Sequence, residues 1–298
     1  MQAKFETPPS YVHLLMASCS DVPTEEELQK FAATEAYPED TFLDTVSNKR
    51  ALVIVAHDDD DCAMSGTIAK LTQAGWYITQ LRLGKHINKA FGTHAVDLIC
   101  AGNELILPDG NYRPGVDTIQ YPYYPISREE IIEQYLHQIV ADSLIAKINR
   151  FQPSVIFTLD DQKGGYGHPD HVFISEMVLS LFQHQAIHNQ RIYQSVYTDH
   201  MEYEIVDTWL KAKLEKWNFP HTSSIANELY QIDGMPEPDV QIDIQEMGEI
   251  KMNYLRAYPE NVKKNLRKFI PYYEEFDAET YFRIFDREFF RVFDEGSV

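Results

Sequence analysis

The sequence has little cysteine and no long apolar run. Its 298 residues include three cysteines, Cys19, Cys62 and Cys100, and no C-x-x-C pair. Such an odd and sparse set does not describe a disulfide framework, and a zinc site made of thiolates is not expected. No apolar run is long enough to span a bilayer, so the sequence predicts no integral membrane span.

Basic residues are also scarce. The chain has 26 Lys and Arg against 46 Asp and Glu, a formal net charge of −20 with histidine counted as neutral. An acidic surface repels phosphate backbones and anionic lipids, so we expect no nucleic-acid partner. The acidity is compatible with a neutral or cationic small-molecule substrate, or it serves solubility alone. The oligomeric state is left open.

Residues 1–48 are predicted to form an N-terminal extension without evident chemistry. Thr24 and Glu27 have the spacing of a capping box, which predicts a short helix. The residues before Cys19 resemble the end of a bacterial lipoprotein signal, but their apolar stretch is short and follows Glu6 and two prolines. We therefore predict an unprocessed cytoplasmic chain, with a lipoprotein lipidated at Cys19 as the alternative.

Strand and helix patterns alternate from residue 49 onward. Residues 51–56 are a continuous apolar run and residues 154–159 are mostly apolar, typical of strands that are buried on both faces of a parallel sheet. Each run is followed by a polar loop and then by apolar residues at helical spacing. This alternation predicts an α/β, Rossmann-like fold with a mostly parallel sheet flanked by helices, in one catalytic domain over residues 49–298.

Two helix predictions concern the later part of the chain. Ser127 and Glu130 form a second capping-box pattern, which opens a long helix that is expected to continue to residue 151. The C-terminal part is expected to be more helical, with helices over residues 209–217 and 247–258. Aromatic residues also recur at helical spacing in the tail: Phe282, Phe285, Phe289 and Phe293.

Polar loops directly follow both buried runs. Residues 56–61 are A-H-D-D-D-D, and residues 167–171 are G-H-P-D-H. Ligands in open α/β sheets bind at the carboxyl ends of the strands, so the loops converge if their strands are neighbours. Aspartates in a row are often a solvated loop, and a His-x-x-His occurs by chance. Together, after two buried strands, they predict a metal centre, because imidazole and carboxylate ligands suit Zn²⁺, Fe²⁺ or Mn²⁺.

The two loops resemble the signature motifs of the LmbE-like, or GlcNAc-phosphatidylinositol de-N-acetylase (PIG-L), family. That family has AHPDDE after its first strand and GHPDH after a later one; this chain has AHDDDD and an intact GHPDH. The resemblance covers roughly residues 50–260. It implies a metal-dependent amidohydrolase, an N-deacetylase that acts on linear amides, with N-acetylglucosamine-type compounds as the default substrate.

The resemblance also implies a role for each motif residue. Asp59 would be the general base on the metal-bound water, and His168 would stabilise the tetrahedral intermediate or help the amine leave. Asp170 would orient or tune a motif histidine. The ligands of a single Zn²⁺ ion, for which Fe²⁺ or Mn²⁺ could substitute, would be His57, Asp60 and His171.

The chain departs from the family pattern at three places. Asp58 and Asp61 stand where the family has proline and glutamate. An Arg-x-x-Glu segment that many members use to hold substrate is not found between residues 85 and 102. Arg82 and Asp109 are therefore the predicted substrate contacts, and the identity of the substrate is open.

Two other functions remain as alternatives. A histidine followed by spaced aspartates after a first strand is similar to the two-manganese DHH phosphoesterases, but these need Asp-His-His where this chain has His-Pro-Asp-His. The other alternative is a sugar-binding protein that has kept the metal and lost turnover.

Overall fold

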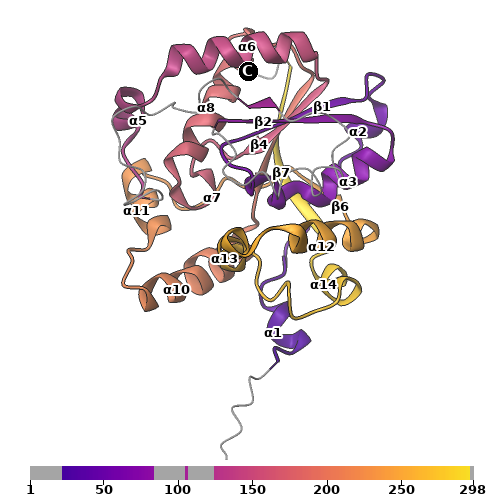
Figure 1. Cartoon of the computed structure of the whole chain (residues 1–298), viewed down its shortest axis with the longest axis vertical. Coiled ribbons are helices and arrows are strands. Elements are labelled where there is room, and N and C mark those ends of the chain that lie inside the picture. The colour runs from indigo at the N-terminus through magenta and orange to yellow at the C-terminus, as the bar shows by residue number, and fades with distance from the viewer. Residues whose placement is uncertain (1–21, 84–104, 107–123, 296–298) are drawn as a thin grey trace, which may run out of the picture.

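The computed structural model describes residues 22–83, 105–106 and 124–295. In this part of the chain, seven strands form one sheet in the order β3-β2-β1-β4-β5-β7-β6 (Figure 1). The strands from β3 to β5 pair in parallel, and β7 pairs antiparallel with β5 and with β6. The predicted α/β fold with a mostly parallel sheet is confirmed. The strands are β1 (Arg50–Val55), β2 (Tyr77–Arg82), β3 (Leu105–Ile106), β4 (Val155–Leu159), β5 (Arg191–Val196), β6 (Val240–Asp243) and β7 (Arg287–Asp294).

Helices cover both faces of the sheet (Figure 1). One face carries α3 (Ser65–Gln73), α12 (Gly248–Ala257) and α14 (Ala278–Ile284), and the other carries α5 (Arg128–Gln134), α6 (His137–Phe151) and α8 (Pro169–Gln183). The remaining short elements are α1 (Glu25–Gln29), α2 (Phe42–Thr45), η1 (Asp60–Met64), α7 (Gly164–Gly167), α9 (Asp199–Met201), η2 (Glu202–Leu210), α10 (Lys211–Lys216), α11 (Thr222–Tyr230), η3 (Gln245–Met247) and α13 (Glu260–Phe269). No helix in the described ranges is long and apolar enough to cross a membrane.

The side chains of β1 explain its continuous apolar sequence. Val53 and Val55 belong to the core under α3 and α12, whereas Leu52 and Ile54 belong to the core under α6 and α8. All four side chains have no exposed surface. A strand between two helical layers has no polar face, because successive side chains point to opposite faces.

The long helix predicted for residues 128–151 is wrong in one respect. The capping box of Ser127 and Glu130 is present, but the helix breaks into α5 and α6 at Tyr135, whose backbone is extended (φ −96°, ψ 149°). The break turns the Tyr135 hydroxyl onto the carboxylate of Asp170. The interruption therefore places the Tyr135 side chain against the second motif, at the start of α8.

The predicted helical spacing of the tail is also corrected. Only Phe282 lies in a helix, α14, and the chain then turns into β7, which carries Phe289 and Phe290. In a strand, alternate side chains share a face, and Phe290 packs on Phe157 with ring centroids 5.7 Å apart. Tertiary pairing with β5 decides this segment, although the rest of the C-terminal part is mainly helical, as predicted.

The segment from residue 22 to 48 packs on the rest of the molecule. Leu28 on α1 is buried in the main core, and the predicted capping box of Thr24 and Glu27 is present at the start of this short helix. Asp40 accepts hydrogen bonds from the Arg191 guanidinium at 3.1 Å and the Tyr193 hydroxyl at 2.9 Å. The predicted boundary between an extension and a catalytic domain stays a prediction, and Cys19 lies outside the described residues.

Candidate metal centre

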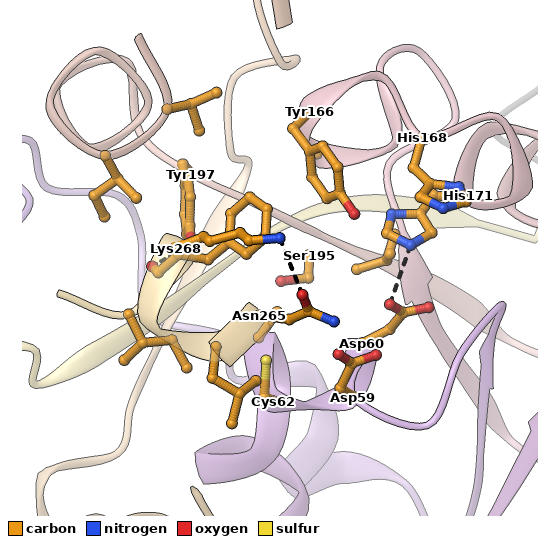
Figure 2. A pocket seen from close by; sticks show the side chains of 18 of the residues that line it. Asp59, Asp60, Cys62, Tyr166, His168, His171, Ser195, Tyr197, Asn265 and Lys268 are labelled. Atoms are coloured by element: carbon orange, nitrogen blue, oxygen red, sulfur yellow. Dashed lines mark hydrogen bonds and ion pairs between the residues drawn. The ribbon is translucent and has the colours of Figure 1, made fainter. Parts of the chain in front are cut away.

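The two polar loops meet because β1 and β4 are neighbours. The pairing of Ala51 with Val155 brings the carboxyl ends of these strands to the same edge of the sheet. The first loop continues into η1, which begins at Asp60, and the second ends at α8, whose N-cap residue is His168. The two motifs therefore share one site, as predicted (Figure 2).

His171 presents one ring nitrogen to the site. Its Nδ1 atom lies 3.0 Å from the carbonyl oxygen of Gly164, which can only accept, so Nδ1 carries the proton. In the neutral ring, Nε2 then carries the lone pair, and it lies 3.1 Å from Asp60 Oδ1. The backbone of Gly164 can come this close because it has φ +61° and no Cβ; an added Cβ would lie 2.8 Å from that of His171.

His57 is oriented in the same manner by Asp170. Its Nε2 atom lies 3.1 Å from Asp170 Oδ2, so in the neutral ring it donates there and leaves a lone pair on Nδ1. The other oxygen of Asp170 accepts from the Tyr135 hydroxyl. A carboxylate that holds the outer nitrogen of a histidine is the usual partner of a metal-ligating imidazole.

Asp60 presents one carboxylate oxygen to each imidazole, Oδ1 to His171 and Oδ2 to His57. Its Oδ2 atom accepts from the backbone N–H groups of Ala56 and His57 at 3.1 and 2.7 Å, which fixes the carboxylate. His57 Nδ1 lies 3.1 Å from His171 Nε2 and 3.5 Å from Asp60 Oδ2. Tetrahedral bonds of 2.0–2.1 Å place ligand atoms about 3.3 Å apart. The donor set and its spacing therefore fit one tetrahedral ion.

His168 lies in the same cluster, and its imidazole nitrogens come within 4.8 Å of those of His57 and His171. It is a weaker candidate ligand than Asp60. Its Nδ1 atom accepts the backbone N–H of Asp170 at 3.1 Å, so in the neutral ring the proton is on Nε2. Burial and the neighbouring His171 hold the pKa of His168 well below its usual value, which keeps the ring neutral. His168 is thus a hydrogen-bond donor.

The electrostatics of the centre favour a positive charge. Burial lowers the pKa of His57, but Asp60 and Asp170 outweigh it and hold that pKa well above the usual value. The pKa of Asp60 is well below its usual value, since His171 and His57 outweigh the effect of burial. With both imidazoles neutral, their two lone pairs and the Asp60 carboxylate would repel one another unless a cation lay among them. These residues could therefore hold a metal ion.

Asp59 is next to the cluster, and its carboxylate faces the pocket (Figure 2). Burial, followed by the negative charge of Asp60, raises the pKa of the Asp59 carboxyl above its usual value. A carboxylate in this setting is a stronger base than an exposed one.

Two tyrosines that sequence reasoning missed hold the first loop. Asp61 is buried, and its Oδ1 atom accepts from Tyr254 and, at 3.1 Å, from Tyr258. Burial raises the pKa of Asp61 to about 7. The only sequence signal is the spacing of the two tyrosines, four residues apart within the stretch that resembles the family; Tyr254 lies on α12 and Tyr258 is its C-cap residue. Asp61 therefore acts as a tether for the loop.

The two predicted substrate contacts have different outcomes. Arg82 is 2% exposed and lines the pocket at the end of β2, and it interacts with the charges of Asp58 and Asp61. Asp109 lies outside the described residues. The substrate role of both residues stays a prediction.

A curated relative from Nakamurella multipartita is similar in sequence to the chain. This protein, "1D-myo-inositol 2-acetamido-2-deoxy-alpha-D-glucopyranoside deacetylase", is 28% identical over 160 residues, which cover 44% of this chain and 54% of the relative. The predicted resemblance to the LmbE-like deacetylases is confirmed. The chain spans about half the length of this relative. No family model matches the chain.

Solved structures also align with the chain. The N,N'-diacetylchitobiose deacetylase from Pyrococcus horikoshii is 18% identical with a TM-score of 0.44, over 84% of this chain and 85% of the other. A deacetylase of teicoplanin biosynthesis is 15% identical with a TM-score of 0.48, over 84% and 100%. A 4-carboxy-2-hydroxymuconate hydratase from Pseudomonas putida is 12% identical with a TM-score of 0.42, over 82% and 95%. These likenesses do not distinguish one activity from another.

Proposed function

We propose that the chain binds one Zn²⁺ ion through His57, Asp60 and His171 and hydrolyses an N-acyl amide of an amino sugar or a related small molecule. The observation that carries the proposal is the convergence of two imidazole lone pairs and one carboxylate at 3.1–3.5 Å. The name of the curated relative, a deacetylase of an acetamido sugar, supports the choice of reaction and substrate class.

The donor set favours zinc over the harder cations. Two imidazoles and one carboxylate leave one tetrahedral position open, which is the arrangement of catalytic zinc sites; Fe²⁺ and Mn²⁺ remain alternatives. When bound, such an ion polarises an acyl oxygen and lowers the pKa of water.

The residues around the ion divide the remaining work. Asp59 takes a proton from the attacking water and returns it to the amide nitrogen as the C–N bond breaks, so that a carboxylate and a free amine leave. His168, with its proton on Nε2, donates a hydrogen bond to the oxygen that gains negative charge. Asp170 keeps His57 in the tautomer with Nδ1 turned inward.

The experiment that tests this proposal combines metal analysis with an assay of acetate release. Purified protein should contain about one zinc per chain, and it should release acetate from at least one member of a panel of N-acetylated amino sugars. In His171→Ala, we expect the bound zinc to fall to near zero and acetate release to fall with it. Two manganese ions per chain with phosphodiesterase activity would instead favour the DHH alternative. Zinc and sugar binding without any release would favour a binding protein.

The contact between Asp170 and His57 gives a second prediction. In Asp170→Asn, the amide presents either an acceptor or a donor to His57 and removes the charge that favours ligation. We expect zinc affinity to fall by about 10–100-fold, as measured by competition with a coloured chelator. Asp142→Asn, on the exposed face of α6, is the control and should bind zinc like the unmodified chain. Equal zinc affinities for both variants would show that Asp170 does not support metal binding.

A further inference from the structure

The metal centre opens into a cavity of about 750 Å³ that continues toward the C-terminal helices. The part of the wall that η2 and α10 supply is apolar and is continued by Phe219 and Phe269, whereas α13 adds the polar side chains of Asn261, Asn265 and Lys268. We call this part the apolar lobe, and its principal residues are Val206, Leu210, Leu214, Phe219 and Phe269. An acetyl group carries a single methyl, which would leave the apolar lobe unused.

The ring of Tyr166 joins the apolar lobe to the metal centre. Its centroid lies 5.5 Å from that of His171 and 4.5 Å from that of Phe269 (Figure 2). A substrate group that leaves the metal centre along this ring therefore passes directly into the apolar lobe.

The wall of the apolar lobe is held by hydrogen bonds to the end of α13. The Tyr197 hydroxyl donates to the carbonyl oxygen of Phe269 at 3.2 Å, and the Trp209 indole donates to that of Arg267 at 3.2 Å. The Lys213 ammonium donates to the same Arg267 oxygen at 2.5 Å. Because these bonds tie α13 to η2 and α10, the apolar lobe is formed before any ligand binds.

We propose that the apolar lobe binds the acyl chain of the substrate, and that this chain is longer than acetyl. The inference rests on the proposed function. Sugar hydroxyl groups lose their hydrogen bonds to water in an apolar lining, so the sugar stays near the polar side chains of Asn261 and Asn265. The amide links the sugar on its nitrogen to the acyl chain on its carbon, and the chain is the part that suits the apolar lobe.

The first test measures kcat/KM for glucosamine acylated with acetyl, butanoyl, hexanoyl or octanoyl groups. Each methylene that enters the apolar lobe contributes to binding, so we expect the hexanoyl amide to exceed the acetyl amide by at least about tenfold. Hydrolysis of the acetyl amide with no gain for longer chains would overturn this inference and leave the proposed function standing. Hydrolysis of none of them would overturn both.

A second arm separates an acyl chain from an apolar group on the sugar. The octyl glycoside of N-acetylglucosamine carries its apolar chain on the other side of the amide. A gain in kcat/KM for this compound, with none for N-hexanoylglucosamine, would assign the apolar lobe to an aglycone and overturn the acyl assignment. A gain for the hexanoyl amide alone supports it.

Variants locate the effect in the apolar lobe. Leu210→Trp fills it and is expected to lower the hexanoyl-to-acetyl ratio of kcat/KM at least about fivefold. Leu229→Trp, at a 41% exposed position on α11, is the matched control and should keep the ratio. If Leu210→Trp does not fold, Leu214→Phe adds less volume to the same wall and carries the same expectation. An unchanged ratio in a folded variant of either kind would overturn the proposal.

Discussion

The Asp59→Asn variant is expected to lose about 10²–10⁴-fold in kcat while it keeps its metal ion. Asparagine has nearly the same shape as aspartate but cannot take a proton at neutral pH. Asp59 faces the pocket, and burial together with Asp60 makes it a stronger base than an exposed carboxylate. The amide should therefore block proton transfer without removing a ligand. Acetate release and zinc content, measured on the same preparation, check the prediction.

The control for this variant is Asp58→Asn. It removes one negative charge from the same loop but neither a proposed ligand nor the proposed base, so we expect a loss of less than about tenfold. Equal losses in both variants would mean that the charge of the loop, and not proton transfer, accounts for the effect. Wild-type turnover in Asp59→Asn would show that the base is another group.

The Lys163→Met variant is expected to lose about 3–5 kcal/mol of unfolding free energy. Lys163 has no exposed surface, and its ammonium donates to the carboxylate of Glu202. Burial raises the pKa of Glu202, and Lys163 opposes that rise. Without Lys163, Glu202 must remain charged and buried or take up a proton, and either outcome costs stability. Urea denaturation at neutral pH measures the loss.

A double variant distinguishes the buried charge from simple packing. Lys163→Met with Glu202→Gln removes both charges and retains an oxygen that can accept the Met235 N–H, which Glu202 accepts at 2.7 Å. We expect it to recover at least about half of the lost stability. Lys216→Met, at an exposed position on α10, should change stability by less than about 0.5 kcal/mol. No recovery in the double variant would attribute the loss to packing of the lysine stem.

The Lys163–Glu202 ion pair also affects the metal centre, because Lys163 belongs to the loop after β4, residues 160–167, which carries the glycines. Asp160 accepts the N–H groups of Lys163 and Gly165 at 2.6 and 2.7 Å, and the next residue, Gly164, holds His171. Glu202 begins η2, which also supplies a wall of the apolar lobe. The buried pair thus links the loop that orients a proposed ligand to the wall of the pocket.

The sequence by itself determined the sheet and the meeting of the motifs. The apolar runs that form β1 and β4 are local patterns, and a strand with no polar face must lie between two helical layers. Loops after neighbouring parallel strands share one edge, and the family resemblance implied that His57 and His171 meet although 114 residues separate them. The residue types, imidazole and carboxylate, then favoured a metal ion as the ligand of this site.

Tertiary structure decided everything that depends on partners distant in the chain. Periodicity could not show that the helix before β4 breaks at Tyr135, or that the aromatic tail leaves its helix to pair with β5, because long-range contacts override local spacing. It also could not show which nitrogen of each histidine faces inward. A tautomer is set by the group at the other nitrogen, here the carbonyl of Gly164 and the carboxylate of Asp170, and only the folded chain brings that group into contact.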